Sequence, residues 1–159
     1  MSTVTIHRAV AADQAVLARL LSDMQAHYRS PDPPGGAADM ARLLTREGER
    51  LPFALLGEHQ GATVGFATLS PILYGGAYQW ELFLKDLYVT EKARGLGVGR
   101  ALLVAIARIA VDEDYSRIDW TTDATNHGAQ RLYDGLGVPR QDKRFYRLAG
   151  GNLRKFADR

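Results

Sequence analysis

Cysteine is absent from this chain of 159 residues. Its absence excludes a disulfide framework and any mechanism that uses a cysteine nucleophile. A G-x-S-x-G elbow and an H-E-x-x-H zinc pattern are also missing, and no pair of the four histidines has a recognised metal-binding spacing. We therefore expect neither a covalent nor a metal-dependent mechanism.

Excess charge and long apolar runs are also lacking. The 20 Lys and Arg residues against 18 Asp and Glu residues leave a formal net charge of +2, which gives no support to nucleic-acid binding. No apolar run reaches the roughly 20 residues of a membrane-spanning helix, and no basic region followed by an apolar core stands at the N-terminus. We expect a cytoplasmic protein without a membrane or nucleic-acid partner.

The composition is that of one soluble globular domain. Hydrophobic residues make up 46% of the chain, and 159 residues suffice to build a single core. The sequence contains no internal repeat and no linker long enough to separate two domains. We expect one domain over residues 1–150 and a short C-terminal tail over residues 151–159.

Hydrophobic periodicity predicts strands and helices in the order β-α-α-β-β-β-α-β-α-β. This order favours an α/β (α+β) fold with a mixed, mostly antiparallel sheet of about six to seven strands flanked by four helices. The predicted strands cover residues 3–8, 52–56, 63–69, 78–89, 117–122 and 144–148, and the predicted helices cover residues 12–28, 37–47, 101–111 and 126–136.

A glycine-rich stretch, Arg94-Gly95-Leu96-Gly97-Val98-Gly99-Arg100, stands between a predicted strand and a predicted helix. Free N–H groups at a helix N-terminus favour phosphate, and glycines let the backbone approach it closely. Arg94 and Arg100 add positive charge at either end. A Walker loop is excluded because no Gly-Lys-Ser/Thr is present, and Arg100 occupies the position of the third glycine of the dinucleotide fingerprint. The alternative is a plain tight turn.

The arrangement R-x-x-G-x-G after an apolar strand resembles the coenzyme A pyrophosphate loop of the GNAT superfamily of N-acetyltransferases. The segment DWTTDATNHGAQRLY, residues 119–133, is similar to the second half of the GNAT core. The pattern is most like the branch of histone/polyamine and diamine (spermidine/spermine) acetyltransferases, and it covers roughly residues 3–149. The resemblance implies the GNAT fold and acetyl-CoA as co-substrate, with no metal.

The resemblance also implies positions for the coenzyme. Its phosphates would bind the loop from Arg94 to Arg100, and its pantetheine arm would contact the backbone of Leu87, Tyr88 and Val89. Asn126 would form a hydrogen bond with the coenzyme arm. The alternatives are an ordinary core strand for residues 87–89 and a helix N-cap for Asn126.

Tyr133 corresponds to the general acid of the family. It follows Asn126 by seven residues, so the two side chains project from similar faces of one helix. A phenol, with a pKa of about 10, is able to protonate a thiolate whose reference pKa is about 8.5. The alternative is a core tyrosine that packs on Leu136.

Lys85 and Asp86 replace a Glu-Asp pair of the diamine acetyltransferases. The lysine reverses the charge beside the acceptor, which argues against polyamines and favours an acceptor that carries a carboxylate, such as an amino acid. A solvated strand lysine is the alternative. The general base is left open among Glu81, Asp86 and a water chain.

His27 and Tyr28 end the first predicted helix, before the proline-rich loop that covers the acceptor in this family. Their positions suit contact with the substrate, although a histidine at a helix C-terminus is also a routine partner of the helix dipole.

The sequence therefore predicts an acetyl-CoA-dependent N-acetyltransferase in which a primary amine of a small molecule or an amino acid attacks directly in a ternary complex. A non-catalytic coenzyme A-binding regulatory domain and a protein-lysine or histone-type acetyltransferase are alternatives. Because relatives commonly pair through their C-terminal strands, we expect a homodimer that uses Phe145 and Tyr146.

Overall fold

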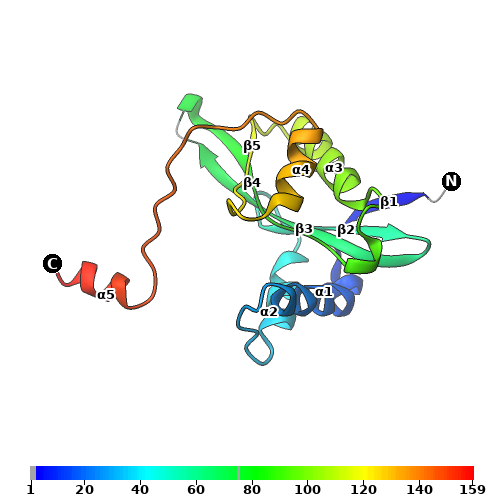
Figure 1. The fold of residues 1–159 in the computed structure, drawn as a ribbon, viewed down its shortest axis with the longest axis horizontal. Coiled ribbons are helices and arrows are strands. Elements are labelled where there is room, and N and C mark those ends of the chain that lie inside the picture. The colour runs from blue at the N-terminus through cyan, green and yellow to red at the C-terminus, as the bar shows by residue number, and fades with distance from the viewer. Residues whose placement is uncertain (1–2, 75) are drawn as a thin grey trace. The chain divides into compact units, whose positions relative to one another are not determined.

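The computed structural model describes residues 3–74 and 76–159, which form two compact units, Met1–Thr125 and Asn126–Arg159. Figure 1 gives the labels of the elements. The first unit contains β1 (Val4–Arg8), α1 (Gln14–His27), α2 (Gly36–Leu44), β2 (Phe53–His59), β3 (Ala62–Tyr74), β4 (Gln79–Val89), α3 (Val98–Asp112) and β5 (Ile118–Asp119). The second unit contains α4 (His127–Gly135) and α5 (Gly151–Ala157).

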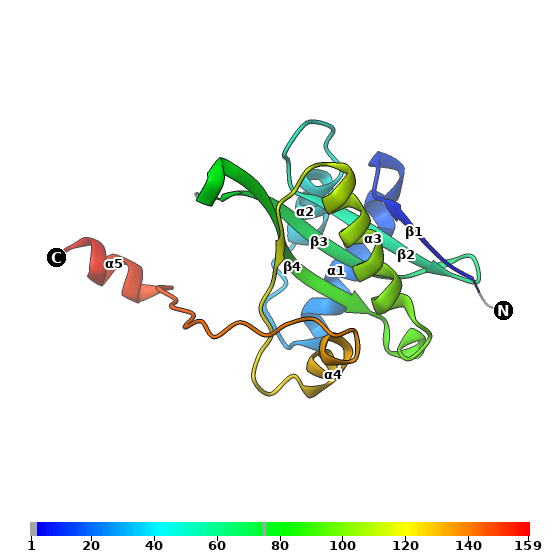
Figure 2. The same ribbon diagram turned by 90° about the horizontal axis from the view of Figure 1, so that it is seen from above.

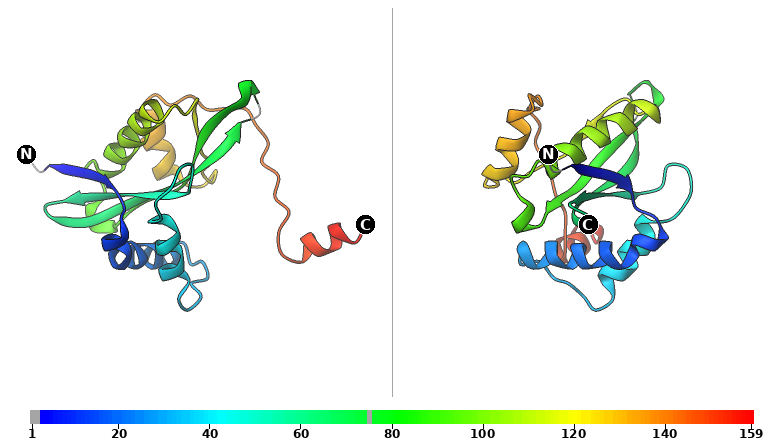
Figure 3. Two further views of the ribbon diagram at one scale, coloured as in Figure 1. Left: turned by 180° about the vertical axis from the view of Figure 1, so that it is seen from behind. Right: turned by 90° about the vertical axis from the view of Figure 1, so that its right-hand side faces the viewer.

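The five strands form one sheet in the order β1-β2-β3-β4-β5. The first four strands pair antiparallel, and β5 pairs parallel to β4. Helices α1 and α2 cover one face of this sheet, and α3 covers the other (Figures 2 and 3). The mixed, mostly antiparallel sheet flanked by helices is confirmed.

The strand β2 is apolar on both faces because both faces are covered. Ala54 and Leu56 belong to the cluster under α1 and α2, whereas Phe53 and Leu55 belong to the cluster under α3. Successive side chains of a strand point to opposite faces, so one continuous apolar run supplies both clusters.

The helices bury one stripe each. In α1, the buried residues recur at helical spacing and belong to the first cluster: Leu17, Leu20, Leu21 and Met24. In α3, the buried residues also recur at helical spacing and belong to the cluster under α3: Val98, Leu102, Ile106 and Ala110. This spacing of three and four residues places an apolar stripe toward the sheet.

Two arginines join the beginning of the chain to the end of α3. Arg8 of β1 contacts the Glu113 carboxylate at 3.0 Å. Arg50 donates to the Glu113 carbonyl at 3.2 Å, and its guanidinium lies 4.3 Å from the centre of the Tyr115 ring. The segments before β2 and after α3 are thereby held together.

A β-bulge interrupts the pairing of β3 with β4. Thr68 pairs with Asp86, but the next pair along β3 is Leu69 with Leu84, so Lys85 is the extra residue. The bulge shifts the alternation of β4 by one position. Leu84 and Leu87 therefore both face the cluster under α3.

The predicted strand at residues 144–148 is wrong. These residues lie in an extended segment that pairs with no strand among the described residues, so the sheet has five strands rather than six to seven. An alternating pattern forms a strand only where a neighbouring strand accepts its hydrogen bonds. The tail forms a fifth helix, α5, where the sequence predicts four helices in all.

No helix within residues 3–74 and 76–159 combines the length and apolar character that a membrane crossing requires.

Candidate functional site: the β4 end and the α3 N-terminus

The glycine-rich stretch forms the turn before α3 and its first residues. Gly95 and Gly97 have φ angles of +79° and +86°, in the left-handed region that glycine adopts without strain. A Cβ built on either glycine would meet no atom within 4 Å, so the space beside this backbone is open. Arg94 and Arg100 are exposed at the two ends of the stretch. The backbone of this turn is therefore accessible to solvent, and the positively charged side chains of Arg94 and Arg100 flank it.

The N-terminus of α3 carries no capping side chain, because its N-cap residue is Gly97. Ala101 makes the first intrahelical bond, at 2.9 Å to the Gly97 carbonyl. The N–H groups of Val98, Gly99 and Arg100 precede that bond and have no partner within the helix. Three directed donors at the positive end of a helix dipole fit the pyrophosphate of a coenzyme A molecule.

The end of β4 has one edge without a strand partner. The pairing of β4 with β5 includes only Leu82 with Ile118 and Phe83 with Asp119. Beyond Phe83, the β5-side edge of β4 has no strand partner among the described residues, and this stretch includes Leu87, Tyr88 and Val89. Their side chains are buried or half-buried, as in a core strand. The side chains of these residues therefore pack as in an ordinary core strand, and one edge of their backbone is also available.

Arg94 connects the glycine-rich turn to β4 and α1. Its Nε donates to the Val89 carbonyl at 3.1 Å, and its Nη2 lies 3.4 Å from Nε2 of His27. Because a guanidinium only donates, this contact is a hydrogen bond in the tautomer that leaves His27 Nε2 as the acceptor. The structure thus brings the predicted acceptor residue His27 to the predicted phosphate-binding arginine.

Two aromatic rings lie against His27. Tyr28 makes an edge contact at 4.9 Å between ring centroids, and the Tyr88 ring lies at 6.0 Å. Burial raises the pKa of the Tyr88 phenol above its ordinary value, and the negative charge of Asp23 raises it further. Tyr88 therefore remains neutral at pH 7 and acts as a packing residue between His27 and Phe66.

Glu81 is engaged in an ion pair. Its carboxylate contacts Arg117 Nε at 2.5 Å, and Arg117 also contacts Asp119 at 3.2 Å. Glu81 is 7% exposed. A buried carboxylate needs such a partner, so Glu81 holds β4 to the segment leading into β5. Arg117 was not among the residues predicted for the site, and no sequence pattern links residues 36 positions apart.

Lys85 and Asp86 lie together at the bulge. Lys85 is exposed, and Asp86 is half-buried. The Thr68 hydroxyl donates to Asp86 Oδ2 at 2.6 Å. Thr68 was also not among the predicted site residues, although a single threonine within the apolar run Phe66-Ala67-Thr68-Leu69 is a visible signal.

Asn126 and Tyr133 belong to the second unit, where both lie at α4. Asn126 is the N-cap, and its side chain accepts from Ala129 N at 3.1 Å, which confirms the capping alternative. Tyr133 is half-buried in the last turns of the helix. Gly137, with a φ of +71°, ends α4 in a Schellman motif in which Val138 N donates to the Tyr133 carbonyl at 3.1 Å.

An ion pair also fixes the end of α4. Arg140 contacts both carboxylate oxygens of Asp134, with Nε at 3.0 Å. The hydrogen bond from Arg140 lowers the pKa of Asp134 below its ordinary value.

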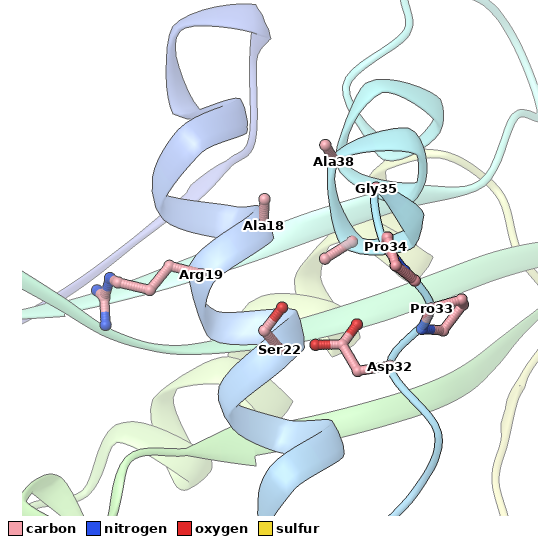
Figure 4. Close-up of a pocket in the computed structure, with 9 residues that line it drawn as sticks. Ala18, Arg19, Ser22, Asp32, Pro33, Pro34, Gly35 and Ala38 are labelled. Carbon is pink, nitrogen blue, oxygen red and sulfur yellow. The ribbon is translucent and has the colours of Figure 1, made fainter.

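A cavity in the first unit lies elsewhere. It has a volume of about 330 Å³ between α1, α2 and the segment that joins them. Figure 4 shows Ser22 of α1 and Asp32 of the joining segment pointing toward one another across it. None of the predicted site residues lines this cavity or the second one, of about 270 Å³, beside Arg8 and Phe53.

The family model described as "Acetyltransferase (GNAT) family" matches residues 17–138. The chain belongs to the GNAT family. This match includes β4, the glycine-rich turn, α3 and α4, which together carry the predicted coenzyme residues.

Three known proteins are similar to this chain. D-amino-acid N-acetyltransferase HPA3 of Saccharomyces cerevisiae is 36% identical over 90 residues, 57% of this chain and 55% of the yeast protein. An integron cassette protein from the mobile metagenome of V. cholerae has a TM-score of 0.80 at 27% identity and covers 98% of both chains. An aminoglycoside N-acetyltransferase solved in complex with CoA has a TM-score of 0.76 at 18% identity, with 92% of this chain and 95% of that chain covered. This chain spans about half the length of the curated relatives it matches.

Proposed function

We propose that this GNAT protein transfers the acetyl group of acetyl-CoA to a primary amine. The observation that carries the proposal is the uncapped N-terminus of α3, where the left-handed Gly95 and Gly97 leave the backbone open between Arg94 and Arg100. The GNAT family membership supports the same chemistry. The loop from Arg94 to Arg100 would hold the coenzyme phosphates, and the open edge at Leu87, Tyr88 and Val89 would hold the pantetheine arm.

Acetyl-CoA would supply the acetyl thioester, and the residues of this chain would place the amine and manage protons. The acceptor's ammonium would first lose one proton to Asp86 or to a water chain, which frees the nitrogen lone pair. Attack of the neutral amine nitrogen on the thioester carbonyl then forms the amide and breaks the carbon–sulfur bond, and the nitrogen loses its second proton by the same route. Tyr133 would donate its phenolic proton to the departing sulfur. Asn126 caps α4 with its side chain, and it would also form a hydrogen bond with the coenzyme arm.

We also propose that the acceptor carries both an ammonium and a carboxylate, as an amino acid does. Asp86 and Lys85 place an anion and a cation next to one another at the bulge of β4. Their charges complement a zwitterion, whereas a polyamine would meet the Lys85 cation. The yeast relative is a D-amino-acid N-acetyltransferase, which supports this class of acceptor. Glu81 is a weaker candidate for the acceptor because Arg117 already neutralises it.

The C-terminal unit provides a candidate dimer interface. Phe145 and Tyr146 are 67% and 88% exposed, and they lie in an extended segment without a strand partner among the described residues. Asn126–Arg159 carries eight Lys and Arg against three Asp and Glu, a net charge of +5, which leaves −3 for Met1–Thr125. Opposite charges support the association of this segment with a second copy in a homodimer.

A panel of acceptors tests the proposed activity. Release of free coenzyme A thiol would be followed with acetyl-CoA and, in turn, amino acids of both configurations, polyamines, aminoglycosides and lysine-containing peptides. We expect turnover with amino acids. Binding of coenzyme A without thiol release above the hydrolysis background for any acceptor would instead indicate a non-catalytic binding domain, and turnover confined to peptides would indicate a protein-lysine acetyltransferase.

A further inference from the structure

Thr68 is a polar residue in an apolar part of β3. It is 5% exposed, and its neighbours on the sheet face under α1 and α2 include the fully buried Phe66 and Leu56. A hydroxyl buried among apolar side chains costs free energy unless it is hydrogen-bonded. An aliphatic residue of similar shape, such as valine, would fill this position without that cost, so packing alone does not account for the threonine.

The partner of the Thr68 hydroxyl is Asp86 Oδ2, at 2.6 Å. An ionised carboxylate only accepts, so the hydroxyl is the donor, and the length is typical of a charge-assisted hydrogen bond. Asp86 makes no ion pair among the described residues. Its second carboxylate oxygen, Oδ1, is therefore available to a ligand.

The bulge at Lys85 brings the two side chains together. Because β4 has one extra residue at this point, Asp86 pairs with Thr68 and lies on the same face as Tyr88, toward α1 and α2. The other acidic residue of β4, Glu81, lies near the opposite end of the strand and is held by Arg117. Asp86 is thus the one carboxylate of β4 without a cationic partner among the described residues.

We propose that Thr68 is a positioning residue that holds the Asp86 carboxylate in place to bind the acceptor's ammonium group. This inference rests on the proposed acetyl transfer to an amine. The hydroxyl fixes Oδ2 and with it the rotamer of Asp86, and Oδ1 accepts a hydrogen bond from the ammonium. A fixed carboxylate loses less conformational freedom when the acceptor binds than a mobile one does.

Replacement of Thr68 tests the hydrogen bond. Thr68→Val keeps the β-branched shape and removes the donor, and Thr68→Ser restores the donor. With lysine as acceptor, which offers both an α-amine and an ε-amine, we expect Thr68→Val to lower kcat/KM for the amine by roughly 10- to 100-fold, mainly through KM. Thr68→Ser should recover most of the loss, and the calorimetric affinity for coenzyme A should stay within about twofold of wild type in both variants. Thr63→Val, at a half-buried threonine of the same strand, is the matched control.

A double-mutant cycle separates positioning from packing. If Thr68 acts through Asp86, Thr68→Val should have little effect on kcat/KM in an Asp86→Asn background. An equal loss in the two backgrounds, or no recovery by serine, would show that Thr68 is a packing residue and would overturn the proposal.

An NMR measurement tests the contact without turnover. The carboxyl carbon resonance of Asp86 should move in Thr68→Val and return toward its wild-type position in Thr68→Ser. An unchanged resonance in Thr68→Val would overturn the positioning role whatever the activity. A moved resonance in a protein that acetylates no amine would leave the contact in place and would reject the proposed function instead.

Discussion

Tyr133→Phe removes only the hydroxyl group and keeps the aromatic ring. The substitution therefore tests proton donation by Tyr133 while preserving its packing. If the phenol protonates the departing thiolate, Tyr133→Phe should lower kcat by roughly 10²–10⁴-fold, because a general acid contributes about that factor. The affinity for coenzyme A should change far less, since the proton is needed in the transition state. Single-turnover kinetics would measure the chemical step directly.

The control for this substitution is Tyr115→Phe, which removes a phenol from a buried residue of the other unit. It should leave kcat close to that of wild type. If Tyr133→Phe does the same, Tyr133 is a packing residue of α4, and water would be the acid.

The second prediction for a single side chain concerns Lys85 and the choice of acceptor. Lys85→Glu places two carboxylates at the bulge, so kcat/KM for polyamines should rise relative to that for amino acids. We expect the ratio to change by about tenfold or more, which corresponds to an energy of about 1.4 kcal/mol.

Arg108→Glu makes the same change in net charge at an exposed position of α3 and serves as the control for Lys85→Glu. A ratio that moves equally in both variants would trace the effect to overall charge. A ratio that moves in neither would place Lys85 in solvent, away from the acceptor.

At the scale of elements, the turn into α3 is the proposed binding site of the coenzyme phosphates. Gly97→Val adds a branched side chain at a φ of +86°, which strains the backbone and fills the space beside the helix N-terminus. We expect the affinity for coenzyme A to fall on the order of tenfold or more in a calorimetric titration.

Gly61→Val is the matched control for this loop. Gly61 has a φ of +75° in the turn between β2 and β3, and open space surrounds it as well. Gly61→Val should lower stability in thermal unfolding about as much as Gly97→Val does, and it should leave the affinity for coenzyme A unchanged. Equal losses of affinity in the two variants would mean that general destabilisation, and not the anion site, is responsible.

The elements of the first unit were largely predictable because their signals are local. The apolar stripe of α1 at Leu17, Leu20 and Leu21 and the glycines before α3 act over a few residues, and both indicate the observed structure. The predicted strand at residues 144–148 failed because a strand also depends on a partner from elsewhere in the chain. The predicted strand at residues 117–122 is shorter in the structure, Ile118–Asp119, for the same reason.

The candidate site divides in the same way. The proposed coenzyme loop is one continuous stretch, so its sequence predicts an anion site without knowledge of the fold. The pairings of Glu81 with Arg117 and of Thr68 with Asp86 join residues 36 and 18 positions apart. They depend on the register of the sheet, and the bulge at Lys85 shifts that register by one residue. No local pattern indicates such a shift.

For the whole molecule, the C-terminal unit determines the expected oligomeric state. Phe145→Asp combined with Tyr146→Asp places two charges on the proposed dimer segment. We expect the dimer to dissociate to a monomer, as measured by light scattering after size-exclusion chromatography, because a desolvated carboxylate without a partner opposes association.

Val111→Asp is the control for the dimer, since Val111 is 78% exposed on α3. It should leave the dimer intact. A wild-type protein that is monomeric at all accessible concentrations would reject this interface, whereas a dimer that persists in the double variant would place the interface on another surface.

The ion pair between Arg8 and Glu113 has a consequence for synthesis on the ribosome. The two residues are separated by 105 positions, and the Arg50 contacts to Glu113 and Tyr115 span more than 60. At roughly 5–20 residues per second, translation needs about 5–20 s to pass from Arg8 to Glu113. During that interval β1 has emerged from the exit tunnel, but Glu113, the later partner of Arg8, has not been synthesised. In this state β1 is exposed to chaperones and to neighbouring nascent chains.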